Sequence, residues 1–244
     1  MNDKVNNASS DGLLAKLERL GSMLLVAAAE REASSLLGGH PVSPWQIEPV
    51  GERSGVLRCG VGKANAAGAV AAALASQQYA GVLSVGVGGV LPGGALAIGE
   101  ALAGSRSVFA DEGITTPSGF SDVAAMGFPP IEDAEGVGFD PDPKLLDAAR
   151  SLGVRAGPIA TVSTCSGADA AARAVRDRTG AWVEAMEGAA VALVCRRMGV
   201  AFLEVRVVSN TTGDRAGQVW DLPLAFERLG ALVGGLIGGT PGAR

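Results

Sequence analysis

Apolar runs alternate with alanine-rich or amphipathic segments along most of the chain. The runs predict buried strands at 23–29, 55–60, 81–89, 157–164, 181–185 and 201–209, with one or two more inside 95–110. The longer segments predict helices at 63–78, 143–152, 168–177, 187–198 and 222–237, and a short helix that begins near Glu30. Such alternation is typical of an α/β fold with a mostly parallel central sheet and helices on both of its faces.

The chain divides into one domain and a short extension. Residues 1–21 carry a polar start and a mixed-charge segment, and we assign them to an N-terminal extension that can be flexible. Residues 22–244 then form a single domain, because α/β sheets often reach this size without splitting. Residues 111–142 hold Pro, Gly, Ser and Asp with little periodicity, which predicts a long ordered loop in which Phe120 and Phe128 could cover a ligand.

Composition narrows the possible partners. The net charge is −5 and Lys and Arg form no cluster, so we expect no nucleic-acid partner. Three separated cysteines (Cys59, Cys165 and Cys195) and one histidine predict neither a disulfide framework nor a metal site. The polar start is no signal peptide, and the last helix is too short and too interrupted to span a bilayer. We expect a cytoplasmic protein that binds a small molecule, with no membrane partner and no metal.

Polar groups gather at the ends of the last two expected strands. Glu187 stands just before a helix and beside Met186, where a carboxylate suits the adjacent hydroxyls of a ribose. Asn210 ends the strand at 201–209 with an amide that both donates and accepts hydrogen bonds. Strand ends that each deliver polar groups are where an α/β sheet builds a pocket. This combination predicts a nucleoside site.

Other candidates lie at the same predicted edge. Glu32 follows the first strand, so it could converge with Glu187 and Asn210 as a general base, although alone it would be a solvated helix residue. Arg206 lies inside an apolar strand and must pair with an acid, either Glu32 or a nearby carboxylate. The remaining substrate-binding candidates stand at the ends of expected strands: Val87, Gly88, Gly89 and Thr164. The glycines among them either let the backbone approach a ligand closely or only make a tight turn.

Four segments together resemble the purine nucleosidase and phosphorylase superfamily: 28–32, 60–67, 186–190 and 206–210. They occur in the order found in that superfamily and spread over most of the chain. The Glu-x-Met-Glu-Gly-Ala-Ala form at 184–190, the Ser-Asn strand end and the Val-Trp-Asp-Leu segment at 219–222 are most similar to the futalosine hydrolase family. The resemblance implies a nucleoside phosphorylase-like fold, a homo-oligomer and no cofactor.

The resemblance also assigns roles. Glu32 falls where the related methylthioadenosine/S-adenosylhomocysteine nucleosidases have the Glu that activates water, and Met186 and Glu187 match their ribose-binding residues. Their purine-side Asp is replaced here by Asn210. An amide donates to the 6-oxo group of hypoxanthine and accepts from N7–H, so it favours an inosine-like base.

The implied reaction is hydrolysis of the N-glycosidic bond of futalosine to hypoxanthine and dehypoxanthine futalosine, a step of menaquinone biosynthesis. Phosphorolysis is less favoured, because a phosphate needs a cationic cradle and the Glu32 carboxylate would repel it. Two alternatives stay open: another 6-oxopurine nucleosidase or phosphorylase, and a nucleoside-binding protein without turnover.

Overall fold

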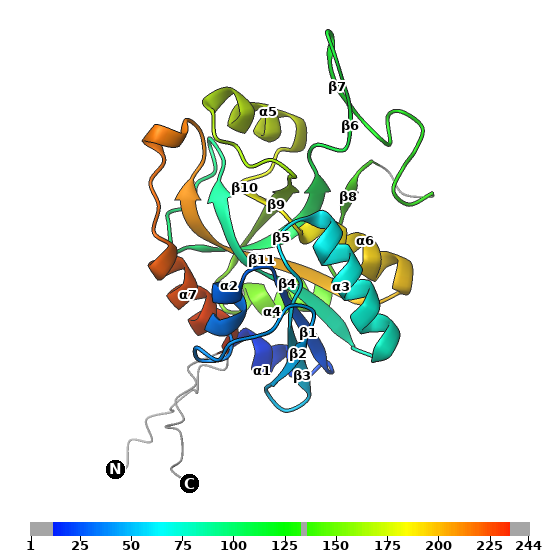
Figure 1. Cartoon of the computed structure of the whole chain (residues 1–244), viewed down its shortest axis with the longest axis vertical. Helices are drawn as coiled ribbons and strands as arrows, with labels where there is room; N and C mark the ends of the chain where they lie inside the picture. Colours follow the sequence, from blue (N-terminus) through cyan, green and yellow to red (C-terminus); the bar gives the residue numbers. More distant parts are fainter. Residues whose placement is uncertain (1–11, 133–135, 235–244) are drawn as a thin grey trace, which may run out of the picture.

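A computed structural model describes residues 12–132 and 136–234 (Figure 1). Within these residues the main sheet has nine strands: β1 (Met23–Ala27), β2 (Ile47–Val50), β3 (Ser54–Arg58), β4 (Gly81–Val90), β5 (Ala101–Phe109), β8 (Gly138–Phe139), β9 (Arg155–Thr161), β10 (Val183–Ala185) and β11 (Ala201–Thr211). Their order is β10-β9-β5-β11-β4-β1-β3-β2, and β8 pairs with β5. Because β10 also pairs with β4, the first five strands of this order close into a ring.

The sheet is mixed, so the expectation of a mostly parallel sheet is corrected. Parallel pairs join β1 to β3 and β4, β4 to β11, and β9 to β5 and β10. Antiparallel pairs join β2 to β3, β5 to β8 and β11, and β10 to β4. The reason lies between β4 and β5, where residues 91–100 hold no helix. A strand that follows without a crossover helix does not have to run parallel to the strand before it.

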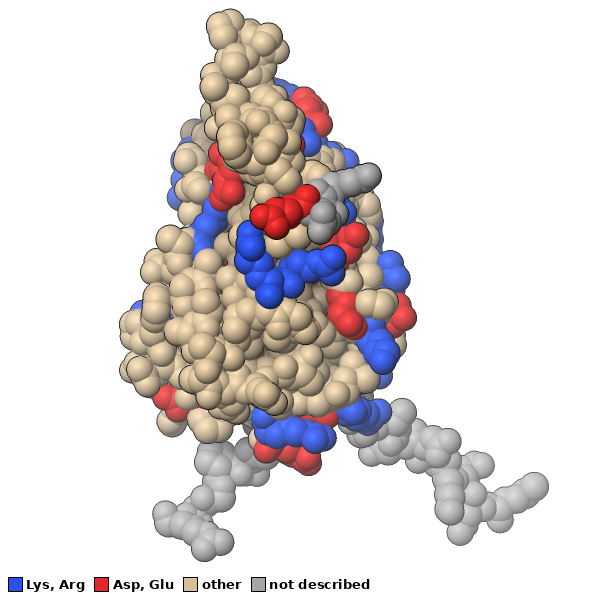
Figure 2. Space-filling view, turned by 90° about the vertical axis from the view of Figure 1, so that its right-hand side faces the viewer, with Lys and Arg blue, Asp and Glu red and all other residues tan. Residues whose placement is uncertain are grey.

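Helices cover both faces of the sheet, as predicted. They are α1 (Leu13–Glu18), α2 (Glu30–Ser35), α3 (Lys63–Ser76), α4 (Pro143–Arg150), α5 (Asp169–Thr179), α6 (Gly188–Met198) and α7 (Leu222–Gly234). Side chains of α1, α2, α4 and α7 share one apolar core, which includes Leu17 and Leu229. The alanine-rich α3 packs against α6 in a second core, which includes Ala69 and Val191. The surface near α3 and α6 carries few charged side chains in its lower half (Figure 2).

The segment 111–142 contains more regular structure than the predicted loop. A hairpin of β6 (Gly113–Thr116) and β7 (Gly119–Asp122) projects from one end of the molecule, and β8 follows it (Figure 1). The hairpin strands are half-exposed and polar, so they lack the apolar periodicity by which a strand is recognised. Pro117 and Ser118 form the turn, and Gly119, with φ of 127°, follows it at the start of β7.

Part of the predicted N-terminal extension is folded into the domain. Residues 13–18 of the predicted extension form α1, whose Leu13, Leu14 and Leu17 side chains are buried in the core. Residues 1–11 lie outside the described residues, as do residues 235–237 of the predicted last helix. None of the described helices combines the length and the apolar character that a membrane crossing requires.

Candidate active site

A pocket of about 440 Å³ opens at the end of the sheet where β1, β4, β10 and β11 reach their carboxyl termini or the turns that follow. It contains most of the predicted site residues. A larger hollow of about 840 Å³, near Phe139, Cys195 and the start of β11, contains none of them. The smaller pocket is therefore the candidate active site, at the place where α/β sheets bind ligands.

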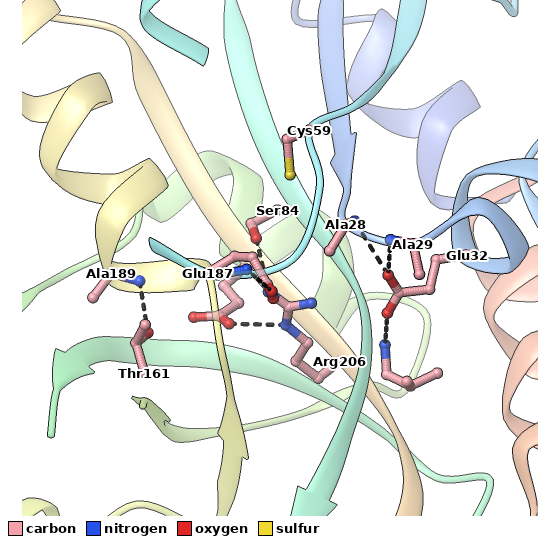
Figure 3. Close-up of polar contacts among 12 residues, drawn as sticks. Ala28, Ala29, Glu32, Cys59, Ser84, Thr161, Glu187, Ala189 and Arg206 are labelled. Carbon is pink, nitrogen blue, oxygen red and sulfur yellow. Dashed lines mark hydrogen bonds and ion pairs between the residues drawn. The ribbon is translucent and has the colours of Figure 1, made fainter. Parts of the chain in front are cut away.

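Glu32 is a buried carboxylate that the backbone holds in place (Figure 3). It is the third residue of α2, and its Oε2 accepts hydrogen bonds from the N–H groups of Ala29 (2.8 Å) and Ala28 (3.1 Å). Its Oε1 accepts from the N–H of Val87 at 2.8 Å, which ties the helix to the end of β4. Burial raises the pKa of Glu32, although the nearby Arg206 opposes the rise. Such a carboxylate is fixed in orientation and is a stronger base than an exposed one.

Glu187 precedes α6 and is part of a buried charge network (Figure 3). Its Oε1 accepts from the N–H of Gly62 at 3.0 Å, and its Oε2 lies 3.4 Å from a guanidinium nitrogen of Arg206. Arg206 is 1% exposed, and its Nε donates to Glu204 at 2.9 Å. Burial opposes its charge, yet Glu204, Glu187 and Glu32 together raise the pKa of Arg206 above the ordinary value. The predicted acid partner of Arg206 is thus Glu204 with Glu187.

Glycine at position 86 is needed for this arrangement. A Cβ there would lie 2.5 Å from both Nη1 of Arg206 and Oε1 of Glu32, far inside van der Waals contact. The bare backbone of β4 therefore lets the arginine and the catalytic candidate Glu32 approach each other. No direct ion pair joins them, and the charge of Arg206 acts on Glu32 by lowering its pKa against the effect of burial.

Asn210 ends β11 with a half-occupied amide. Its Oδ1 accepts from the hydroxyl of Ser209 at 2.8 Å, and its Nδ2 donates to the carbonyl oxygen of Thr211 at 2.9 Å. One N–H and one lone pair of the amide are left for a ligand. The Thr211 carbonyl oxygen can only accept, so this contact fixes which way the amide points, and oxygen and nitrogen are not interchangeable in this site.

The structure brings most of the predicted residues together. Val87, Gly88, Gly89 and Met186 line the pocket beside Glu32, Glu187 and Asn210. Thr164 is exposed and is not among the lining residues. The next three residues line it instead: Cys165, Ser166 and Gly167. Arg206 lies beneath the pocket and reaches it through Glu187. Phe120 and Phe128 are also absent from the lining, so the hairpin side chains do not cover the pocket in this structure.

Sequence reasoning missed two buried carboxylates. Glu204 stands two positions before Arg206 on β11, and residues two apart in a strand face the same side, so this pairing had a readable signal. Glu184, inside the short apolar β10, had the same signal as Arg206: a charge within a buried strand. Its Oε1 accepts from the N–H of Ser166 (2.8 Å) and its Oε2 from the Ser166 hydroxyl (2.6 Å). Glu184 lines the pocket.

Metal and thiol chemistry find little support in the described part of the chain. No group of three His, Cys, Asp or Glu side chains there is placed to hold a metal ion, and the absence of a cofactor stays a prediction. Burial raises the pKa of Cys59, beside Glu187, to about 12, so this thiol is protonated at neutral pH. Cys59 is therefore no nucleophile for the pocket.

Comparison with known proteins supplies the family. The model of the phosphorylase superfamily matches residues 47–237, which is most of the chain. The chain belongs to the phosphorylase superfamily. Its fold agrees: a methylthioadenosine/S-adenosylhomocysteine nucleosidase from Neisseria meningitidis superposes with a TM-score of 0.69 at 22% identity, over 87% of this chain and 95% of that one. A futalosine hydrolase structure from Helicobacter pylori gives 0.68 at 18% identity, over 86% and 94% of the two chains.

Relatives within the superfamily are closer in sequence. A futalosine hydrolase of Acidothermus cellulolyticus is 36% identical over 220 residues, which cover 87% of each chain. One from Streptomyces coelicolor is 37% identical and covers 74% of this chain and 77% of its own. One from Thermus thermophilus is 35% identical, with coverage of 77% and 83%. This superfamily member therefore matches N-glycosidic hydrolases along most of its length, as the sequence motifs predicted.

Proposed function

We propose that the protein hydrolyses the N-glycosidic bond of futalosine and releases hypoxanthine and dehypoxanthine futalosine, a step of menaquinone biosynthesis. The observation that carries this proposal is the meeting of Glu32, Glu187 and the half-occupied amide of Asn210 in one pocket. The proposal is supported by relatives at 35% to 37% identity that are futalosine hydrolases. The three residues act on three parts of one nucleoside: Glu32 at the anomeric carbon, Glu187 at the ribose hydroxyls and Asn210 at the base.

Each residue has a role that follows from its surroundings. Glu32, held by three backbone N–H groups, removes a proton from water as the water oxygen bonds to the anomeric carbon. The bond from that carbon to N9 breaks, and its electron pair leaves with the base, which takes up a proton from solvent at N7, while Glu32 later returns its proton to solvent. Asn210 donates to O6 and accepts from N7–H. Glu187, anchored by Gly62 and Arg206, accepts from the ribose hydroxyls.

The charges in the pocket favour water over phosphate as the nucleophile. Within the described chain, Arg215 is the one lysine or arginine that lines the pocket, and its side chain is exposed. Arg206 is compensated by two carboxylates and has no charge left for an anion. A phosphate beside Glu32 and Glu187 would meet two negative groups without the cluster of arginines that usually binds it.

Release of the free base tests the reaction. Purified protein is offered futalosine, inosine or methylthioadenosine, each with and without phosphate, and the products are separated by chromatography. We expect hypoxanthine from futalosine at a rate that phosphate does not change. Release from inosine only with phosphate would identify a phosphorylase. No release from any of the three would leave nucleoside binding without turnover.

We further propose that Arg215 binds the aromatic carboxylate that futalosine carries on the 5′ side of its ribose. Arg215 begins the 3-10 turn η1 (Arg215–Gly217), and its guanidinium lies 4.7 Å from the ring centre of Trp220. Gln218 links the two, since its Oε1 accepts from Arg215 (2.9 Å) and from the indole N–H of Trp220 (3.0 Å). The rim thus offers a cation and an aromatic face to an aryl acid.

Replacing Arg215 tests this role. The variant Arg215→Ala should raise KM for futalosine by about threefold to tenfold, the range for an exposed charged hydrogen bond, and leave KM for inosine unchanged. Arg173→Ala is the control, because Arg173 is an exposed arginine of α5 that pairs with Asp169. An equal rise for both substrates would mean that Arg215 only holds the 218–220 segment.

Homo-oligomerisation and a cytoplasmic location also stay proposals. The resemblance implies an oligomer, and the broad surface with few charges near α3 is compatible with a second copy of the chain (Figure 2). Light scattering of the purified protein measures its mass: a single chain of 24.3 kDa would contradict the proposal.

A further inference from the structure

Glu184 and Asn210 stand on either side of the same glycine. In the register of three adjacent strands, Gly89 of β4 lies opposite Glu184 of β10 and opposite Asn210 of β11. Paired residues project from the same face of a sheet, and both side chains line the pocket. A Cβ on Gly89 would lie 2.8 Å from Cγ2 of Thr212 and 3.0 Å from the Asn210 amide nitrogen, so the packing requires a glycine between the two polar side chains.

The Glu184 carboxylate faces the pocket as a hydrogen-bond acceptor. Burial raises the pKa of Glu184, while the two Ser166 donors that contact it oppose the rise and favour its ionised form. Each carboxylate oxygen uses one lone pair on Ser166 and keeps another. Glu184 is 5% exposed, and the proposed chemistry at Glu32, Glu187 and Asn210 assigns it no task. A buried carboxylate with spare acceptors in a ligand pocket is expected to meet a donor.

Hypoxanthine supplies such a donor. Along one edge its ring presents N7, the 6-oxo group and N1–H in sequence. The free N–H and the free lone pair of Asn210 serve O6 and N7–H, which leaves N1–H without a partner. A buried N–H without an acceptor is costly. The acceptor has to lie on the far side of O6 from Asn210, and Glu184 lies across Gly89 from Asn210.

We propose that Glu184 accepts the hydrogen bond from N1–H of the base and, with Asn210, makes the pocket select 6-oxopurines. This inference rests on the proposed function, because it places hypoxanthine between the two residues. Adenine has a lone pair at N1, which would face the Glu184 carboxylate and repel it. Discrimination of this kind comes from stranding a buried polar group rather than from shape.

The test compares two substrates in the variant Glu184→Gln. We expect the ratio of kcat/KM for futalosine to that for its 6-amino analogue to fall by about 10- to 100-fold, since the amide donates to N1 of adenine and accepts less strongly from N1–H. Glu18→Gln is the matched control, because Glu18 is also a buried carboxylate that accepts from a serine hydroxyl and from backbone N–H groups. The control should leave the ratio unchanged.

The variant Ser166→Ala separates recognition from support. It removes the hydroxyl that orients Glu184 and keeps the acceptor. We expect it to lower the rates for both substrates while the preference for 6-oxopurines persists. If Glu184→Gln also lowers both rates equally, Glu184 only supports the 165–167 segment and the proposal is overturned.

A binding measurement with the unaltered protein keeps the inference apart from the proposed function. Calorimetry compares hypoxanthine, which has N1–H, with 1-methylhypoxanthine, which lacks it and keeps the imidazole N–H. We expect hypoxanthine to bind at least about tenfold more tightly. This outcome supports the role of Glu184 even if futalosine is not hydrolysed. Equal affinities would overturn it even if futalosine is hydrolysed.

Discussion

Replacing Glu32 by Gln should lower kcat by about 10²- to 10⁴-fold and leave KM within about threefold, the effect of removing a general base that substrate binding does not require. The amide keeps the shape of the side chain but cannot take a proton from water. One of the two carboxylate oxygens becomes an N–H₂ group, which cannot accept a hydrogen bond. The variant therefore loses either the contacts from Ala28 and Ala29 or the contact from Val87. Steady-state kinetics with futalosine measure both constants.

The control for Glu32 stands two positions earlier on the same helix. Glu30 pairs with Arg58 away from the pocket lining, so Glu30→Gln should leave kcat unchanged. Loss of turnover in the Glu30 variant, or full turnover in the Glu32 variant, would remove Glu32 from the mechanism. A thermal unfolding curve for each variant shows whether α2 still folds.

The same residue sets the acidic limb of the pH profile. The base acts only when ionised, and burial raises its pKa above the ordinary 4.5. Activity should therefore be lost, as the pH falls, at a higher pH than for an exposed glutamate. In the Glu32→Gln variant this limb should disappear from the remaining rate.

Replacing Asn210 by Asp should change which base is released. A carboxyl group accepts from the 6-amino group of adenine but repels the 6-oxo group of hypoxanthine. The amide N–H instead donates to the 6-oxo group and meets no acceptor at a 6-amino group. We expect the ratio of kcat/KM for futalosine to that for its 6-amino analogue to fall by about 10²-fold or more, because a wrong base leaves buried polar groups unpaired. Base release from the two substrates gives the ratio directly.

Ser209→Ala provides the comparison for Asn210. This variant keeps the amide and removes the hydroxyl that donates to its Oδ1. Its rates should fall for both bases with less effect on the preference. If Asn210→Asp instead lowers both rates equally, Asn210 is a structural strand end and carries no base specificity.

Much of the fold could be predicted because local patterns determine it. Most strands and helices from β1 to α7 lie where apolar runs and alanine-rich segments predicted them, with ends shifted by a few residues. The direction of β5 could not be predicted, because strand direction depends on pairing between distant segments. The hairpin β6–β7 was missed since its polar strands lack apolar alternation, and α1 was missed because its burial depends on α4 and α7.

The candidate site was predicted to a similar extent. Motif resemblance located Glu32, Glu187 and Asn210, which line one pocket. The strand-end candidate Thr164 does not line the pocket, whose lining begins at Cys165, because the turn after β9 has no regular periodicity from which to count. Glu204 and Glu184 each carried a readable signal, a carboxylate inside an apolar strand. The sequence could not show which of them reaches the pocket, because the order of the strands in the sheet is not contained in the linear pattern.

The pocket has a ribose end, where substitutions of the buried charges beneath it are costly, and a base end, where substitutions are less costly. Glu187 and Glu204 both pair with Arg206, so replacing the arginine leaves two buried carboxylates without their cation, and replacing either carboxylate removes one of its two buried partners. Within the described residues, Asn210 and Glu184 instead form hydrogen bonds with the backbone and with single serines. A descendant of this protein could therefore exchange its purine by single substitutions at the base end, while any new sugar specificity would require several changes at once.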